Sequence, residues 1–186
     1  MKCIITGHTS GVGKAIYDHF LSKGWEVQGM SRSNGYDISI DQDRIVSEAT
    51  GCDIFVNCAY AGDAQTELLD KLKDKVKSMI VVGSVAADWA RIWKDYGESK
   101  ERLQDKCKEV SLEDNAMYAN IFYLKLAFCE NTQWTIFVDE KYKVSFVELM
   151  KIVDMWIEVP KIFSVEFTLK KTNEIMGYAK QMNPHD

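Results

Sequence analysis

Three side chains in the middle of the chain have types and spacing suited to acid–base chemistry. Tyr96 and Lys100 stand four positions apart, so a helix would place them on one face, one turn from each other. A free tyrosine titrates near ~10, but an ammonium a few ångströms away favours the phenolate and can lower that pKa by ~1–3 units. Ser84, which closes an apolar run before Tyr96, adds a hydroxyl. The spacing therefore predicts a phenol that exchanges a proton near neutral pH.

The Tyr96 and Lys100 pair also fits the start of an ordinary amphipathic helix, with the phenol on a sheet and the ammonium in solvent. Tyr-x-x-x-Lys occurs often by chance, so the pair alone does not establish a site. Ser84 is predicted to end a strand, and open α/β sheets bind ligands at the carboxyl ends of their strands. That position favours the chemical interpretation.

A glycine-rich turn lies between the first apolar run and the first helical pattern. Its glycines, Gly7, Gly11 and Gly13, let the main chain approach a ligand closely, and the helix that follows offers N-terminal amides to a pyrophosphate. The other residues of this predicted binding loop are Thr9, Ser10 and Val12. A Walker A loop is excluded because His8 stands where that motif needs glycine and Ala15 where it needs serine or threonine.

Strands and helices are predicted to alternate along the chain. The predicted strands cover 2–6, 25–31, 36–38, 53–59, 79–83, 117–125 and 162–169, and the helices 13–23, 41–49, 64–77, 96–109 and 145–158. Nearly continuous apolar strands alternating with helices indicate a parallel sheet covered on both faces. The prediction is an α/β fold: a single-domain, Rossmann-type, doubly wound parallel sheet with helices on both faces, over 1–170, followed by a C-terminal tail, 171–186.

Amino-acid composition and net charge limit the kinds of partner expected for this protein. A chain of 186 residues with 46% apolar residues is expected to form one domain with its own core. The net charge of −5 is spread along the chain without a basic stripe, which argues against a nucleic-acid partner. No apolar run approaches the roughly 18 residues that cross a bilayer, and no leader pattern opens the chain, so we expect no membrane contact and a cytoplasmic location. The five scattered cysteines are interpreted as reduced core residues.

The glycine turn and three further segments resemble the short-chain dehydrogenase/reductase family, in the family's order. These segments are TGHTSGVG at 6–13, DIFVNCAYAG at 53–62, VVGSVAAD at 81–88 and YGESK at 96–100. The resemblance implies that Tyr96 exchanges a proton with the substrate oxygen, that Lys100 also holds the nicotinamide ribose, and that Ser84 orients the carbonyl. The implied activity is hydride transfer between a nicotinamide cofactor and a small carbonyl or alcohol substrate.

Cofactor preference is predicted from the end of the second strand. NAD enzymes of this type usually place an acidic side chain there, whereas this chain has Ser31, Arg32 and Ser33. A guanidinium and hydroxyls can hold a 2′-phosphate, so NADP(H) is predicted over NAD(H). The alternative is that Arg32 is a solvated surface residue. The resemblance also implies that Asp37 and Ile38 contact adenine and that Asn57 and Ala59 line the dinucleotide, although Asn57 fits a buried turn residue equally well.

The chain departs from the family pattern in three places. There is no room for a helix between Arg32 and Asp37, and only one helix fits between Asn57 and Ser84. The asparagine that usually completes the family's catalytic tetrad has no clear counterpart. The Pro-Gly that usually starts a substrate lid is absent from 120–139, so we expect a shallow, open pocket, with Trp89 and Trp93 as candidate walls.

These departures leave other functions open. One is a catalytically impaired NADP(H)-binding sensor or regulatory protein, and another is an epimerase or dehydratase of the family's extended branch, for which the C-terminal half is small. The run from Phe146 to Val159 is apolar nearly all round, which predicts a homodimer through 146–169. A monomer in solution with Met150 and Trp156 exposed would count against this prediction.

Overall fold

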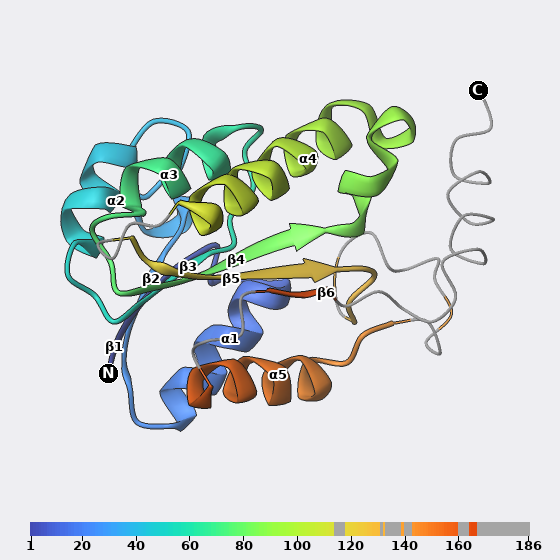
Figure 1. Ribbon diagram of the computed structural model, residues 1–186. Helices are drawn as coiled ribbons and strands as arrows, with labels where there is room; N and C mark the ends of the chain where they lie inside the picture. Colours follow the sequence, from blue (N-terminus) through green and yellow to red (C-terminus); the bar gives the residue numbers. More distant parts are fainter. Residues whose placement is uncertain (114–117, 131, 133–138, 140–142, 160–163, 167–186) are drawn as a thin grey trace.

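The computed structural model describes residues 1–113, 118–130, 132, 139 and 143–159, together with the main chain of 164–166. The strands are β1 (Lys2–Thr6), β2 (Glu26–Met30), β3 (Ile54–Asn57), β4 (Ser78–Ser84), β5 (Asn120–Leu126) and β6 (Ser164–Glu166). They form one sheet in the order β2-β1-β3-β4-β5-β6, and every neighbouring pair is parallel (Figure 1).

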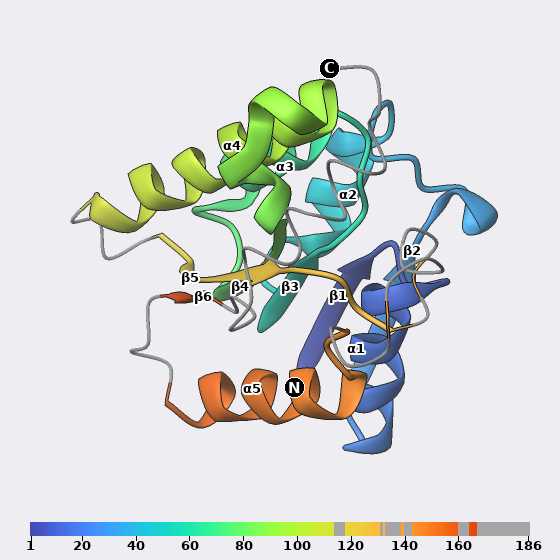
Figure 2. The same ribbon diagram turned by 90° about the vertical axis from the view of Figure 1, so that its right-hand side faces the viewer.

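Helices cover both faces of this sheet. They are α1 (Gly11–Ser22), α2 (Gln42–Ala49), α3 (Ala64–Leu72), α4 (Ala90–Leu112) and α5 (Phe146–Glu158), with short 3-10 turns η1 (Arg32–Asn34) and η2 (Val85–Trp89). Helices α1 and α5 lie on one face, and α2, α3 and α4 lie on the other (Figures 1 and 2). The predicted doubly wound α/β fold is thus confirmed.

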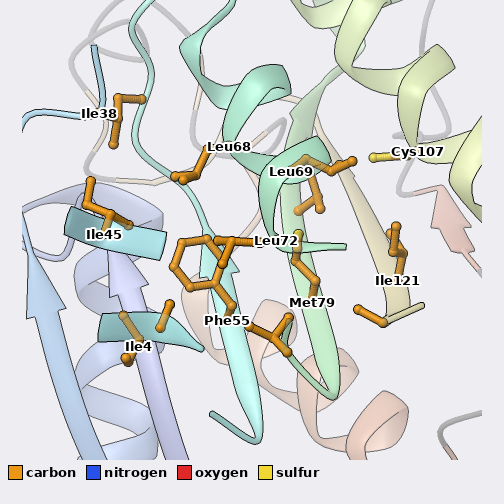
Figure 3. Packing of buried hydrophobic residues seen from close by; sticks show 14 of the residues in the cluster. Ile4, Ile38, Ile45, Phe55, Leu68, Leu69, Leu72, Met79, Cys107 and Ile121 are labelled. Carbon is orange, nitrogen blue, oxygen red and sulfur yellow. The ribbon is translucent and has the colours of Figure 1, made fainter. Parts of the chain in front are cut away.

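Alternate residues of each strand enter opposite core layers. Ile4, Phe55 and Met79 pack against α2, α3 and α4, while the next residue of each strand faces α1 and α5. In Figure 3, Leu68, Leu69 and Leu72 of α3 reach the first of these layers. Each such fully buried side chain contributes about 1.5–3 kcal/mol, so the central strands form a rigid frame. The ends of β1, β3 and β4 are therefore fixed relative to one another.

The order of the strands creates a topological switch point between β1 and β3. The chain runs from β1 outward to β2, and then returns to β3 on the other side of β1. The connections after β1 and β3 therefore diverge to opposite faces. Open α/β sheets bind ligands at such a switch point, outside the carboxyl ends of the strands.

The predicted third strand at 36–38 is wrong. The main-chain N–H groups of Ile40 and Asp41 both donate to the carbonyl of Asp37, and the Asp37 carboxylate accepts from the Ser39 N–H at 2.9 Å. These local bonds close a turn, so the segment does not pair with the sheet. Strand β2 consequently forms one edge of the sheet.

Two further predictions concern the C-terminal region and the cysteines. The predicted tail, 171–186, lies outside the described residues. Cys3, Cys52, Cys107 and Cys129 are buried and Cys58 is partly buried, and all five thiols are free.

Among the helices that the structure describes, none has the length and apolar character needed to span a membrane.

Part of the apolar surface of α5 that was predicted to form a dimer contact is buried within the chain itself. Trp156 is 1% exposed and stacks on Phe122 with ring centroids 5.0 Å apart, and Met150 is 8% exposed. Both side chains are thus buried within the single chain, so neither needs a partner subunit to cover it. Val147, Met155 and Val159 remain exposed on the same helix. A homodimer through 146–169 stays a prediction, and 160–163 and 167–169 lie outside the described part.

Candidate active site

The loop between β1 and α1 needs glycine at two positions. Gly7 has φ +75°, and a Cβ on it would lie 3.0 Å from the Cα of Ala59. A Cβ on Gly13, which is buried in the first turn of α1, would lie only 2.2 Å from the carbonyl oxygen of Gly7. No side chain fits at either place, so the loop folds tightly back on itself at the switch point.

The hydroxyl of Thr6 ties this loop to the end of β3. Its Oγ1 accepts hydrogen bonds from the N–H groups of Cys58 (3.1 Å) and Ala59 (3.2 Å), and it donates to the carbonyl of Val56. Thr9 and Ser10 are exposed at the start of α1, and Gly11 and Val12 are half-buried. The predicted loop residues thus lie at the switch point, with Ala59 directly beneath Gly7. Sequence analysis missed the role of Thr6, because a threonine inside a strand has no special pattern.

The predicted trio of Ser84, Tyr96 and Lys100 converges beside the switch point. Ser84 ends β4, and its Oγ accepts from the Ala86 N–H at 3.1 Å. Tyr96 follows a break in α4 at Lys94, whose φ is +43°, and 36% of its side chain is exposed. Lys100 lies one turn further along, with its Nζ 5.7 Å from the centroid of the Tyr96 ring. The helical spacing therefore brings the phenol and the amine together as predicted.

Lys100 is deeply buried and bound to carbonyl oxygens. Its side chain is 4% exposed, and its Nζ donates to Oε1 of Gln65 at 2.6 Å and to the carbonyl of Val82 at 3.2 Å. Burial disfavours the charged form and lowers the pKa of Lys100 to about 8. The amine therefore changes charge near the upper end of the physiological range.

The expected decrease in the Tyr96 pKa is wrong for this structure. Burial of the hydroxyl end raises the pKa of Tyr96 above its ordinary value, and a hydrogen bond with Ser84 opposes that shift only in part. The reason is the position of Lys100: its Nζ lies below the ring, held by Gln65 and Val82, rather than at the phenol oxygen. Desolvation is then the largest cause of the shift in the Tyr96 pKa.

Tyr60 is a further site residue that sequence analysis missed. Its ring meets the Tyr96 ring edge to face, with centroids 4.9 Å apart at 78°, and the Nζ of Lys100 lies 5.3 Å from its centroid. The two phenol rings therefore cover the buried amine, an arrangement in which each ring face attracts the cation. Tyr60 is 46% exposed and lies in the segment DIFVNCAYAG, 53–62. Its place in this family-like segment was the signal that could have identified it.

Asn57 is buried, as the alternative interpretation predicted, but it is the last residue of β3 rather than a turn residue. It is 0% exposed, and its Nδ2 donates to the carbonyl of Gln65 at 2.8 Å. In return, Nε2 of Gln65 donates to the carbonyl of Asn57 at 2.7 Å. The Asn57 side chain thus fastens the start of α3 to the end of β3. A contact between Asn57 and a dinucleotide stays a prediction.

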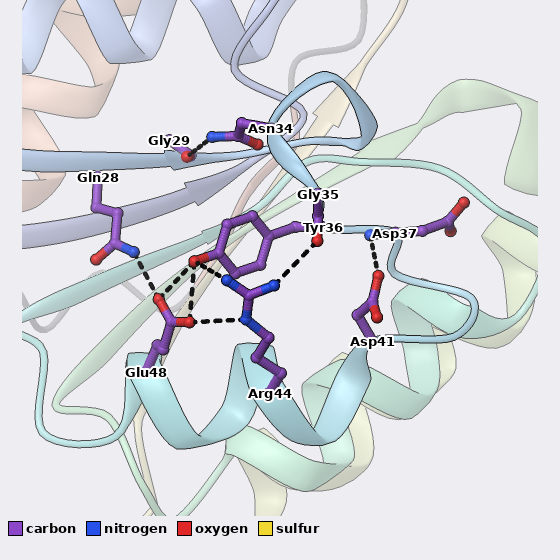
Figure 4. A network of polar contacts seen from close by, with 9 residues as sticks. All are labelled: Gln28, Gly29, Asn34, Gly35, Tyr36, Asp37, Asp41, Arg44 and Glu48. Atoms are coloured by element: carbon purple, nitrogen blue, oxygen red, sulfur yellow. Dashed lines mark hydrogen bonds and ion pairs between the residues drawn. The ribbon is translucent and has the colours of Figure 1, made fainter.

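A polar network shapes the turn after β2 (Figure 4). Ser31 and Arg32 belong to the start of this turn, at η1. Oδ1 of Asn34 accepts from the Ser31 N–H at 2.8 Å, and its Nδ2 donates to the carbonyl of Gly29. The hydroxyl of Tyr36 donates to the carboxylate of Glu48 at 2.8 Å, which lowers the pKa of Glu48. The turn is thereby held at the end of β2.

The guanidinium of Arg44 stacks on the Tyr36 ring at 4.2 Å and donates to Glu48 at 3.1 Å, whereas Arg32 is exposed. Arg44 is therefore bonded within the network, whereas the side chain of Arg32 is exposed to solvent. The Asp37 carboxylate binds Ser39, which lowers the pKa of Asp37, with a smaller contribution from Arg32. Ile38 is 5% exposed and belongs to the core layer of Figure 3. The Ile38 side chain is thus used for packing, and the predicted adenine contacts remain untested.

Two predictions about the substrate side remain open. Trp89 and Trp93 lie just before Tyr96 and are both half-buried, and their role as substrate walls stays a prediction. The region expected to hold a lid, 120–139, includes 131 and 133–138, which lie outside the described part of the chain. Within the described ranges, no group of His, Cys, Asp or Glu side chains is arranged to hold a metal ion.

Comparison of the sequence with protein-family models and with curated proteins finds no match. Solved structures do match. A 3-alpha-hydroxysteroid dehydrogenase from Pseudomonas sp. B-0831, complexed with NADH, matches with a TM-score of 0.73 and 17% identity, over 95% of this chain and 98% of that one. The fold is that of the short-chain dehydrogenase/reductases.

Other short-chain dehydrogenase/reductase structures agree with this result. The 3-ketoacyl-(acyl-carrier-protein) reductase from Brucella melitensis, complexed with NADH, matches with a TM-score of 0.72 and 18% identity, over 89% of this chain and 96% of that one. The bulky-bulky ketone specific alcohol dehydrogenase from Comamonas testosteroni has a TM-score of 0.65 and 14% identity, over 100% and 94%. Identities this low establish the fold alone.

Proposed function

We propose that this protein is an NADP(H)-dependent oxidoreductase of the short-chain dehydrogenase/reductase type, acting on a small carbonyl or alcohol substrate. The observation that carries the proposal is the convergence of the glycine loop with Ser84, Tyr96 and Lys100 at one edge of the sheet, beside the switch point. The similar structures support a nicotinamide cofactor, since two of those proteins were complexed with NADH. The preference for NADP(H) rests on Arg32 at the end of β2.

The residues present fit a dinucleotide. The tight approach of Gly13 to the carbonyl of Gly7 leaves bare main chain in front of α1, and the N-terminus of a helix attracts phosphate. Thr9, Ser10 and Val12 lie at the same surface. A nicotinamide group bound there would supply or accept the hydride. Ala59, below the loop, would line the dinucleotide.

The proton step belongs to this chain's own side chains. Tyr96, with its pKa held high by burial, is protonated at neutral pH and suited to give a proton to a carbonyl oxygen during reduction. Ser84, its hydrogen-bond partner, would orient that oxygen. Lys100 would add positive charge below the phenol and stabilise the phenolate that remains.

A regulatory dinucleotide-binding protein is the second candidate. It is favoured by the opposed shifts at the site, since burial raises the pKa of Tyr96 and lowers that of Lys100. Such a site binds a cofactor without being poised to form a phenolate. This candidate predicts cofactor binding with no turnover of any carbonyl substrate.

Calorimetry followed by kinetics tests the proposed function. We expect heat of binding with NADPH, and oxidation of NADPH, followed by absorbance, with at least one member of a broad aldehyde and ketone panel. Binding without turnover would favour the regulatory candidate. Absence of binding heat with NADPH, NADP, NADH and NAD would contradict both.

Replacing Arg32 with aspartate tests the cofactor preference. A charge-assisted hydrogen bond contributes about 1.5–3 kcal/mol, so we expect the Kd for NADPH to rise roughly ten- to a hundredfold and that for NADH to fall or stay unchanged. Lys151→Asp, the same reversal of charge at an exposed position of α5, serves as the control and should leave both constants unchanged. An equal loss of affinity for both cofactors would show that Arg32 does not read the 2′-phosphate.

A further inference from the structure

Gln65 occupies an unusual position for an uncharged polar side chain. It lies in the first turn of α3, is 1% exposed, and uses both ends of its amide. Its Nε2 donates to the carbonyls of Asn57 (2.7 Å) and Val82 (3.0 Å), and its Oε1 accepts from Lys100 at 2.6 Å. One side chain thus joins β3, β4 and α4 at the point where the amine is buried.

We infer that Gln65 is the positioning residue of Lys100, which it holds below Tyr96 through its amide oxygen. This inference rests on the proposed function, in which Lys100 acts on Tyr96 and on the cofactor. The geometry carries it: Nζ of Lys100 is held between Oε1 of Gln65 and the carbonyl of Val82, and Gln65 is itself bonded to that same carbonyl. The Lys100 amine, the Gln65 amide and the Val82 carbonyl are therefore each bonded to the other two, and this arrangement fixes the position of the amine.

The uncharged character of Gln65 also matters. An amide oxygen accepts a hydrogen bond from either the ammonium or the neutral amine, so it fixes the position of Lys100 without fixing its charge. The titratable groups around Lys100 are the thiols of Cys58 and Cys107 and the phenols of Tyr60 and Tyr96. Burial raises the pKa of both thiols, so Cys58 and Cys107 are uncharged at neutral pH. Gln65 is thus the side chain through which the ionisation of Lys100 can be altered.

Variants at Gln65 test this inference through Lys100 itself. The titration of Lys100 is followed by NMR in protein labelled with ¹³C and ¹⁵N on lysine, and its signal is assigned from its loss in Lys100→Met. We expect Gln65→Glu to raise the pKa of Lys100 by about 1–3 units, because a carboxylate stabilises the ammonium, and Gln65→Met to lower it, because an acceptor is removed. A purely structural role would not give shifts of opposite sign.

A pH profile of turnover provides the second readout. If Lys100 must be charged, NADPH-dependent activity is constant below its pKa and falls above it, so the alkaline limb should move up in Gln65→Glu and down in Gln65→Met. Gln65→Asn, which keeps the amide but withdraws it by one methylene, should shift the limb in the same direction as Gln65→Met, by less. This variant keeps the test valid if the methionine variant does not fold.

Gln42→Met is the matched control, since Gln42 is also buried, at 7% exposed, but bonds to Glu67 rather than to Lys100. It should leave both the titration of Lys100 and the alkaline limb unchanged. An identical Lys100 titration in the wild type and in all folded Gln65 variants would overturn the inference. Shifts of opposite sign in a protein that turns over no substrate would support it while contradicting the proposed oxidoreductase.

Discussion

Tyr96→Phe is expected to lower kcat for NADPH-dependent carbonyl reduction by about 10²–10⁴-fold, the usual contribution of a positioned general acid. The phenylalanine ring can keep the edge-to-face contact with Tyr60, whose centroid lies 4.9 Å away, and the position above Lys100. Only the hydroxyl, and with it the proton donor beside Ser84, is removed. The loss should therefore appear in kcat, measured from the steady-state decrease in NADPH absorbance, and in the rate constant of a single turnover.

Cofactor affinity separates this effect from a general disturbance of the site. The Kd for NADPH, measured by calorimetry, should change less than about twofold, since phosphate binding depends on the glycine loop and not on the phenol. Tyr118→Phe is the control, because Tyr118 packs at the opposite end of β5, where the Nζ of Lys73 lies 5.1 Å from its ring centroid. Retention of more than a tenth of kcat in Tyr96→Phe would remove Tyr96 from the chemistry.

Gly13→Ala is expected to remove cofactor binding. Its Cβ would lie 2.2 Å from the carbonyl oxygen of Gly7 and 3.2 Å from Sγ of Cys58, so either the loop or the start of α1 must move. Overpacking of this kind costs about 1–3 kcal/mol of the free energy of unfolding. The same displacement disturbs the main chain that would face the phosphates, so we expect the Kd for NADPH to rise at least about a hundredfold, which corresponds to about 2.7 kcal/mol.

Gly24→Ala distinguishes loss of the binding loop from loss of stability. Gly24 has φ +74° and nothing within 4 Å of a Cβ, so alanine there is strained by its backbone alone, at a cost of about 1–2 kcal/mol. It should lower the midpoint of thermal unfolding to a similar extent while leaving the Kd for NADPH unchanged. An unchanged Kd in a folded Gly13→Ala variant would place the cofactor somewhere other than this loop.

The glycine loop and the Tyr96–Lys100 spacing were predictable because each depends on a few neighbouring residues. Helical geometry places residues four apart on one face whatever surrounds them, and a strand-to-helix turn with glycine at Gly7 and Gly13 allows few other structures. The wrong prediction of a strand at 36–38 also has a cause in neighbouring residues. The turn at Asp37 was mistaken for a strand because the alternation of Tyr36, Asp37 and Ile38 does not reveal that Ser39 would bond to the Asp37 carboxylate and close a turn.

The polar interior of the site was not predictable in this way. Gln65 has the character of an ordinary exposed residue in an amphipathic helix, and only the packing of α3 against β3 and β4 places its amide against Lys100. The direction of the Tyr96 pKa shift follows from the same packing. Sequence spacing brings an amine near a phenol, but it does not tell how far water is excluded from either.

Taken alone, the sequence determined the alternation of strands and helices, the bare loop at the end of β1, and the one-turn spacing of Tyr96 and Lys100. Tertiary structure decided which polar groups are buried together: Asn57 with Gln65, Gln65 with Lys100, and Tyr60 with Tyr96. The physical reason is that backbone geometry is set by neighbours in the chain, whereas desolvation and hydrogen bonding of a side chain depend on what other elements bring against it.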